Sequence, residues 1–290
     1  MARKRNKQKH AGKAARNRGT PRKARKPPMA SVADRHDLYQ RSVQEPEPDL
    51  LFINRVFRSH FDRPARLLRE DFCGTAATAC FWVQMNKENR AIGIDLDSDP
   101  LVWGREHNVS QLSDDQASRI KLIQGDVRDM GHELVDVTIA FNFSYFIFKT
   151  RAEILDYFVR ARATLRPEGL LILDAYGGPD AQRTYEELRE CEGFDYIWDQ
   201  HKFDPINNFG LNYIHFEFSD GSRLRKAFTY EWRLWSLPEL RDILNEAGFE
   251  KVESYWEGTD KDTGEGNSIF TRRNSAVDDP AWVAYLVARR

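Results

Sequence analysis

Short apolar runs alternate with helix-like segments from residue 65 onward, and this alternation limits the possible folds more than any other feature. The predicted strands cover residues 65–71, 91–97, 120–126, 135–145 (running into a loop) and 170–178. Helices are predicted over residues 75–89, from residue 99 and from Thr150. Strands and helices that alternate at this spacing are typical of a parallel sheet with helices on both faces. The unbroken apolar run in the last strand also fits a buried parallel strand.

Two helix starts carry strong local signals. Thr150 with Glu153, and Ser236 with Glu239, have the spacing of a capping box, in which each side chain accepts from the backbone N–H of the other residue. Gly248 is placed to end the second of these helices. Strands are then predicted over 251–258 and 267–274, and a short amphipathic helix over the end of the chain, 279–290.

Residues 178–235 interrupt the alternation. Ile214, Phe216 and Phe218 alternate with polar residues before a turn at 219–221, and a second alternating run returns at 228–232. This pattern predicts an antiparallel hairpin, inserted before the last helix as a lid. The hairpin region is rich in aromatic residues: Tyr213, Phe216, Phe228, Tyr230, Trp232 and Trp235. Packing of the hairpin on the body explains them, and a cage for a cationic amine is the alternative.

The N-terminal segment has a charge that the net value of −1 conceals. Residues 1–30 hold 12 of the 44 basic residues and no acid, so the remainder carries 32 basic against 45 acidic residues, a net charge of −13. Because this segment has almost no large apolar side chain, we predict a disordered basic tail. Residues 31–64 are predicted to form a helical cap. In it, residues 39–49 act as a polar strap and Asp49 caps a helix with Leu50, Leu51, Ile53, Val56 and Phe57 on one side. Residues 65–290 are predicted to form the main domain.

Composition excludes several classes of protein. The chain of 290 residues is long enough to bury roughly three-quarters of its unfolded surface. It has three cysteines with no CxxC pair, which argues against a disulfide scaffold or zinc-finger array and suits a reducing, cytoplasmic location. We predict no metal site, no membrane span and no signal peptide.

The turn after the first strand, Glu70-Asp71-Phe72-Cys73-Gly74-Thr75-Ala76, pairs with an acid after the second strand, Asp95. A tight turn followed by such an acid is the layout of a nucleoside site, because the turn lets backbone approach the ligand and the acid accepts from ribose hydroxyls. A dinucleotide would need G-x-G-x-x-G, but Phe72 and Ala76 replace glycines. The pattern therefore favours a nucleoside without phosphates, such as S-adenosylmethionine (SAM).

Region 65–273 resembles the class I, seven-strand, Rossmann-like SAM-dependent methyltransferases. The resemblance is carried by Glu70–Ala76, Gly93-Ile94-Asp95, Gly125-Asp126-Val127, Leu165–Asp174 and Trp235–Phe249, in this order. It implies a seven-stranded sheet and SAM as cofactor. It also implies roles for individual residues. Glu70 orients the loop or meets the amino group, Cys73, Gly74 and Thr75 line the methionine end, and Asp95 holds the ribose. Leu96 packs on adenine, and Asp126 and the Val127 N–H form hydrogen bonds with adenine. Asn142 faces the sulfonium.

The acceptor and any general base are less constrained. Asn142-Phe143-Ser144-Tyr145 lies where some amine methyltransferases carry N-P-P-Y, but both prolines are missing. A base is needed only if the acceptor must lose a proton before it reacts. Tyr145, His215, Tyr230 and Glu231 are the candidates.

Three functions remain open at this point. The first is methyl transfer to a small molecule under the lid. The second is an RNA or ribosome-associated methyltransferase recruited by the basic tail, which the net charge of the body, −13, disfavours. The third is an inactive interaction module, against which the intact acids Glu70, Asp95 and Asp126 argue.

Overall fold

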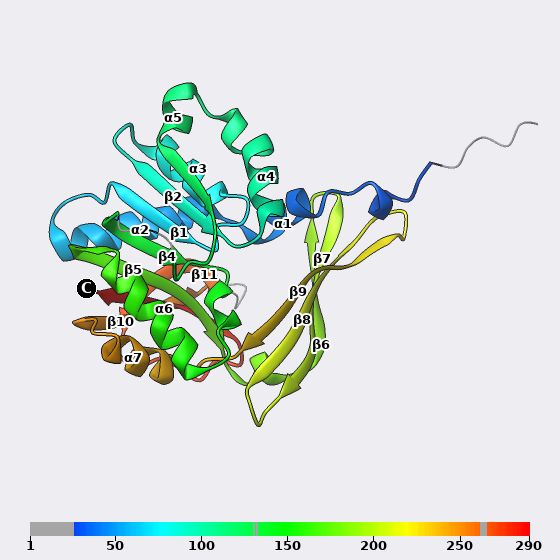
Figure 1. Cartoon of the computed structure of the whole chain (residues 1–290). Coiled ribbons are helices and arrows are strands. Elements are labelled where there is room, and N and C mark those ends of the chain that lie inside the picture. The colour runs from blue at the N-terminus through cyan, green and yellow to red at the C-terminus, as the bar shows by residue number, and fades with distance from the viewer. Residues whose placement is uncertain (1–25, 130, 132, 262–265) are drawn as a thin grey trace, which may run out of the picture.

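The computed structural model describes residues 26–129, 131, 133–261 and 266–290, which form two sheets (Figure 1). The larger has eight strands in the order β11-β10-β12-β5-β4-β1-β2-β3, and the smaller has four in the order β6-β7-β8-β9. Strands β1 to β5 of the large sheet are parallel, while β12 runs antiparallel between β5 and β10. The predicted Rossmann-like α/β fold is confirmed, and its sheet has one strand more than the seven predicted, because the end of the chain adds β12 between β5 and β10.

The elements of the large sheet and its helices follow the predicted order up to β11, with the short helix α5 in addition. They are β1 (Leu67–Asp71), α3 (Ala77–Met85), β2 (Arg90–Asp95), α4 (Ser98–His107), α5 (Asp114–Ser118), β3 (Ile120–Gln124), β4 (Val135–Ala140), α6 (Arg151–Ala163), β5 (Leu165–Gly177), α7 (Leu237–Glu246), β10 (Lys251–Thr259), β11 (Gly266–Arg273) and β12 (Trp282–Arg289). Short 3-10 turns lie at η2 (Val109–Gln111), η3 (Ser144–Ile147) and η4 (Pro179–Gln182). Both predicted capping boxes form, at the starts of α6 and α7.

The core has two parts, one on each face of the large sheet. Because side chains alternate along a strand, Leu67 joins one part and Leu68 the other. The first part packs against α6 and α7, and the second packs against α3 and against α2 (Pro46–Phe61). The predicted cover of helices on both faces is therefore present.

The end of the chain is a strand, so the predicted amphipathic helix at 279–290 was wrong. Residues 282–289 form β12 and pair with β5 on one side and β10 on the other. From Ala284 to Ala288 every residue is buried. A short run that is apolar on both sides suits an interior strand better than a helix with a solvent face.

The insert is larger than the predicted hairpin. Four antiparallel strands form it: β6 (Tyr185–Cys191), β7 (Phe194–Asp204), β8 (Phe209–Glu217) and β9 (Arg223–Arg233). The predicted pair corresponds to β8 and β9, and its turn at 219–221 lies between them. Together, strands β6 and β7 contain more charged residues than β8 and β9, and β6 is exposed along nearly its whole length. Neither strand therefore shows the apolar alternation by which a strand is predicted from sequence.

The segment before β1 also differs from the prediction. Residues 39–43 belong to helix α1 (Arg35–Val43), whose cap is Asp34, rather than to a strap. Helix α2 begins at Pro46, which suits the first turn of a helix, so Asp49 lies inside the helix instead of capping it. Of the predicted apolar side, Leu51 is exposed. Figure 1 shows α1 between α4 and the insert sheet.

The basic tail was predicted to be disordered over residues 1–30, and residues 1–25 of it lie outside the part of the chain that the structure describes. The last residues of that predicted segment are ordered, since Met29–Ser31 form the turn η1. The backbone N–H groups of Met29 and Ala30 donate to Asp220 and Ser222 of the insert.

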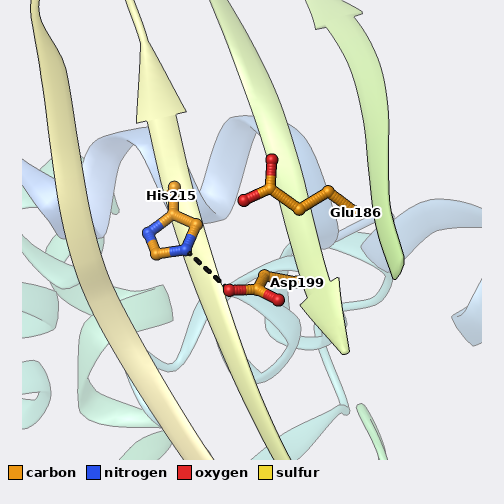
Figure 2. Close-up of side chains that lie close together, drawn as sticks. All are labelled: Glu186, Asp199 and His215. Carbon is orange, nitrogen blue, oxygen red and sulfur yellow. Dashed lines mark hydrogen bonds and ion pairs between the residues drawn. The ribbon is translucent and has the colours of Figure 1, made fainter. Parts of the chain in front are cut away.

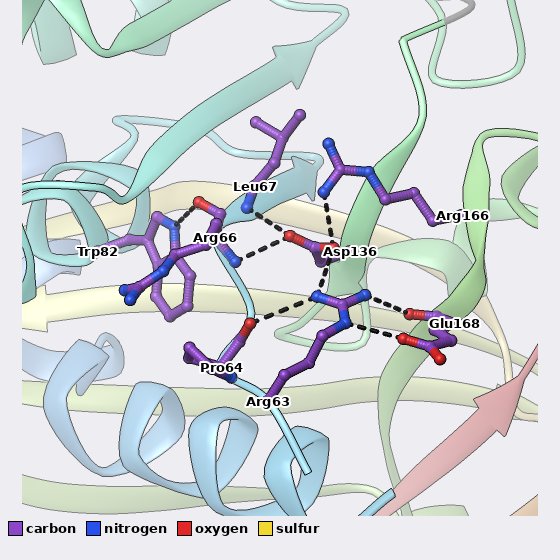
Figure 3. A network of polar contacts seen from close by, with 8 residues as sticks. All are labelled: Arg63, Pro64, Arg66, Leu67, Trp82, Asp136, Arg166 and Glu168. Atoms are coloured by element: carbon purple, nitrogen blue, oxygen red, sulfur yellow. Dashed lines mark hydrogen bonds and ion pairs between the residues drawn. The ribbon is translucent and has the colours of Figure 1, made fainter. Parts of the chain in front are cut away.

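A buried carboxylate connects the starts of β1, β4 and β5 (Figure 3). Asp136, in β4, accepts from the backbone N–H groups of Arg66 and Leu67 at 2.8 and 2.9 Å. It also pairs with the guanidinium groups of Arg166 and Arg63 at 2.8 and 3.1 Å. Burial alone would raise the pKa of Asp136, but these bonds together hold the pKa below its ordinary value.

We predict that Asp136→Asn destabilises the protein by about 3 kcal/mol, the scale for breaking a buried ion pair. Because the pKa of Asp136 is lowered, its stabilising effect is complete above about pH 4 and is lost as the pH falls below that value. Urea unfolding of both proteins at pH 7 and pH 3 measures this difference. Glu168→Gln, which removes a half-exposed partner of Arg63, is the matched control and should cost less than about 1 kcal/mol. Equal losses in the two variants would contradict this account.

Candidate functional site

The loop between β1 and α3 follows a left-handed path at alternate residues. Phe72, Gly74 and Ala76 have φ angles of 59°, 52° and 58°. Such angles favour glycine, and other residues adopt them at a cost of roughly 1–2 kcal/mol. Phe72 and Ala76, which stand where the dinucleotide pattern has glycines, therefore keep the backbone conformation of glycine.

Two hydrogen bonds join this loop to the end of β2. The Gly74 N–H donates to Asp95 Oδ2 at 2.8 Å, and the Cys73 N–H donates to the Ile94 carbonyl at 2.9 Å. The other carboxylate oxygen of Asp95 accepts from the Asp97 N–H at 2.9 Å. Burial raises the pKa of Asp95. The turn and the acid predicted to act together are thus in direct contact.

Glu70 and Cys73 lie behind the loop rather than on its open side. Glu70 accepts from the Ala79 N–H at 3.0 Å and bonds the Thr78 side chain, so it holds the start of α3. Burial raises the pKa of Glu70 to about 8. Burial also raises the pKa of the Cys73 thiol. Glu70 therefore contacts the start of α3, and its role at the site stays a prediction.

A cavity of about 460 Å³, called the first cavity below, opens where β1, β2 and β4 end. The predicted residues that line it are Gly74, Thr75, Asp95, Asn142 and Tyr230. The opposite wall comes from α1, with Arg35, His36, Tyr39 and Gln44 near it, and from β9, with Lys226 and Phe228. Sequence reasoning missed the α1 residues because it treated 39–49 as a strap. The signal was Asp34, which caps α1 by accepting from two backbone N–H groups.

Asn142 and Phe143 continue the left-handed backbone after β4. Their φ angles are 56° and 55°, and their N–H groups donate to the two oxygens of Asp174 at 2.6 and 2.9 Å. Asp174 is buried in β5, and burial raises its pKa to about 8. The carboxyl group holds Asn142 at the wall of the first cavity.

The predicted adenine contacts do not line this cavity. Leu96 is 68% exposed. The Asp126 carboxylate pairs with the Arg128 guanidinium at 2.6 Å, a bond that lowers the pKa of Asp126. The Val127 carbonyl accepts from the Arg69 guanidinium at 2.6 Å. The Val127 N–H remains the group predicted to contact adenine.

Three of the four candidate bases lie away from the first cavity. Tyr145 is completely buried and donates to the Asp174 carbonyl at 2.7 Å. Glu231 pairs with Lys149 at 2.7 Å on the opposite face of β9 from Tyr230. Only Tyr230 reaches the cavity, and its hydroxyl is hydrogen-bonded to that of Tyr39.

His215, the remaining candidate, belongs to a polar cluster with Asp199 and Glu186 on the insert (Figure 2). Its Nδ1 accepts from the Lys226 N–H at 2.7 Å, so Nε2 carries the proton and donates to Asp199 at 3.2 Å. Glu186 in turn pairs with Arg223 at 2.9 Å. With both ring nitrogens engaged, His215 joins β8 to its neighbours, and it does not line the first cavity.

A second cavity adjoins the first, and a third adjoins the second. The second, of about 440 Å³ and called the aromatic cavity, shares Tyr39, Asn142 and Tyr230 with the first. The third, of about 800 Å³ and called the outer cavity, shares Phe143, Trp198, Glu187 and Arg189 with the aromatic cavity. Of the aromatic residues noted in the sequence, Tyr230 and Trp232 line the aromatic cavity and Phe228 lines the first. Phe216 and Trp235 are packed in the cores, and Tyr213 lies beside His215.

Comparisons with known proteins establish the fold. No protein-family model and no curated protein matches the sequence. Solved structures do match it: the CcbJ methyltransferase from Streptomyces caelestis (TM-score 0.63, 19% identity, 84% of this chain and 95% of that one) and a SAM-dependent methyltransferase from Clostridium acetobutylicum (0.63, 15%, 87% and 96%). A third is CalS10, an amino pentose methyltransferase from Micromonospora echinaspora with SAM bound (0.60, 17%, 88% and 95%). The chain therefore has the Rossmann-like fold of SAM-dependent methyltransferases.

The raised pKa of Glu70 predicts a pH-dependent stability. The folded protein keeps the proton of Glu70 up to about pH 8, whereas the unfolded chain releases it near pH 4.5, so Glu70 makes the free energy of unfolding fall as the pH rises between these values. Glu70→Gln should remove up to about 1.4 kcal/mol per pH unit from that slope. Urea unfolding at pH 5, 6 and 7 measures it. The exposed Glu88→Gln serves as control, and an unchanged slope in Glu70→Gln would contradict the assignment.

Proposed function

We propose that this protein is a SAM-dependent methyltransferase that acts on a small-molecule acceptor in the cytoplasm. The observation that carries the proposal is the Gly74–Asp95 contact at the wall of the first cavity. It brings together a glycine turn and the acid predicted to bind ribose, at the carboxyl ends of parallel strands, which is where such sheets bind ligands.

The residues at the first cavity fit this cofactor. A side chain at Gly74 would meet nothing within 4 Å, so the backbone is open to a ligand on that side. In this proposal Asp95 accepts from the ribose hydroxyls, while Gly74 and Thr75 hold the methionine end. Asn142 lies beside the sulfonium. Cys73 shapes the turn from behind, and Leu96, Asp126 and the Val127 N–H lie around adenine.

The bound cofactor supplies an activated methyl group, so the contribution of the chain is to hold the acceptor in line and exclude water. Asn142, held by Asp174, and the hydrogen-bonded pair Tyr39–Tyr230 surround the place where the first and aromatic cavities adjoin. Burial raises the pKa of Tyr39 to about 12 and that of Tyr230 well above its ordinary value. The two hydroxyls are therefore neutral groups that position the acceptor rather than strong bases.

A small acceptor is supported by the aromatic cavity of about 440 Å³, which adjoins the first cavity at Tyr39, Asn142 and Tyr230. CalS10, which shares this fold, is an amino pentose methyltransferase. The RNA alternative depends on the basic residues 1–30, of which 1–25 lie outside the described part of the chain. No helix in the described ranges is long and apolar enough to cross a membrane.

We predict that SAM binds with micromolar affinity and NAD does not, as measured by titration calorimetry. Asp95→Ala should weaken SAM binding at least tenfold, because the ribose loses its acceptor and the Gly74 N–H loses its partner. Asp129→Ala, which removes an exposed carboxylate outside the cavity, is the control. Unchanged affinity in a folded Asp95→Ala protein would refute the cofactor assignment.

A protein without residues 1–25 should bind SAM as the full chain does, because no residue of the first cavity precedes Arg35. Calorimetry on both forms tests this. Loss of binding or of folding on truncation would give the tail a structural role and contradict its predicted disorder.

A further inference from the structure

The aromatic cavity has walls that suit a positive charge. The rings of Trp198, Tyr230 and Trp232 lie 4.6 to 5.9 Å apart between centroids and form one continuous aromatic surface. Tyr196 extends this surface. The guanidinium carbon of Arg189 already lies over the Tyr196 ring, 5.0 Å from the ring centroid. A cation near such rings is attracted to their faces, most strongly where water is excluded.

The charged side chains around the aromatic and outer cavities are mostly acidic, which complements a positively charged ligand. Glu187 lines both cavities, and no cation in the described part of the chain pairs with it. Glu257 and Asp279 add two more carboxylates to the outer cavity. Arg189 is the one cationic side chain among the described residues of these walls, and it already donates to the Ser42 carbonyl. The acids therefore outnumber the cations.

The position of these cavities relates them to the reaction. The aromatic cavity adjoins the first cavity at Tyr39, Asn142 and Tyr230, and adjoins the outer cavity at Glu187 and Trp198. A ligand that enters from the outer cavity passes the carboxylates, then the aromatic rings, and ends beside Asn142. A path of this length suits an elongated molecule rather than a single small amine.

We propose that the aromatic and outer cavities bind the methyl acceptor as an elongated amine that carries a positive charge away from the nitrogen to be methylated. This inference rests on the proposed function. The charged end lies among the aromatic rings and Glu187, and the uncharged reacting nitrogen lies between Asn142 and Tyr230. An acceptor that is anionic along its length, such as a nucleic acid, does not fit these walls.

The transfer step needs no further reactant. The lone pair of the acceptor nitrogen forms the new N–C bond while the C–S bond of the sulfonium breaks, and that bonding pair stays on sulfur as a neutral thioether. The methylated nitrogen then carries the positive charge and releases a proton to water. This order explains why no strong base is needed beside Tyr230.

Three probes of equal length test the charge preference. The full-length protein, saturated with S-adenosylhomocysteine, is titrated with 1,8-diaminooctane, 1,8-octanediol and octanedioate, and binding is followed by calorimetry. We expect the diamine to bind at least tenfold more tightly than the diol, and the dianion not to bind. Equal binding of diamine and diol, tighter binding of the dianion, or no binding of the diamine would each overturn the proposal.

Two variants localise the effect. Glu187→Gln should weaken diamine binding about fivefold and leave the diol unchanged, because only the charge is removed. Glu190→Gln, on the same strand but outside the three cavities, should change neither. Trp198→Leu should weaken the diamine more than the diol. Equal effects of the two glutamate substitutions would overturn the assignment of the site.

Binding of S-adenosylhomocysteine is measured separately in every variant. If it binds and the diamine does not, the acceptor inference fails and the proposed function stands. If it does not bind, the proposed function itself fails.

Discussion

The hydrogen bond from the Gly74 N–H to the Asp95 carboxylate is the contact on which the candidate site depends. It crosses from the end of β1 to the end of β2 and turns a glycine-poor loop toward the first cavity. Phe72 and Ala76 hold left-handed angles that neither residue favours, so other contacts must stabilise the loop. The Cys73–Ile94 backbone bond and the packing of Phe72 against Phe148 and Tyr157 supply them.

Helix α1 connects this loop to the insert and so completes the site. Gln40 contacts both Thr75 and Asn108, and the Asn108 side chain also donates to the Thr75 carbonyl. On its other side, α1 reaches the insert through Arg41, which donates to the Glu192 carbonyl. Because α1 contacts both the loop and the insert, it holds the two walls of the first cavity together.

The sequence predicted the parts of the molecule that have regular patterns. The parallel strands, both capping boxes and the Gly74–Asp95 pairing follow from periodicity and residue type, which local physics determines. The sequence-based prediction failed where contacts between distant parts of the chain determine the structure. The run at 282–289 reads as a helix until β5 and β10 are known to flank it. Tyr145 and His215 were reasonable bases by type, but only the fold shows that Tyr145 faces the core and that both nitrogens of His215 are engaged.

The insert sheet divides its chemistry between its two faces, and this division determines what the site can recognise. Along β9, Phe228, Tyr230 and Trp232 alternate with Glu231, so the aromatic residues reach the cavities and the charged one faces Lys149. The opposite face holds the His215–Asp199 pair, which fixes strand register without touching the cavities. Substitutions on the cavity face therefore leave the contacts that fix the register in place. In the proposed function, the aromatic surface beside Asn142 selects the acceptor and the loop at Gly74 binds the cofactor, so the two roles fall on separate parts of the chain.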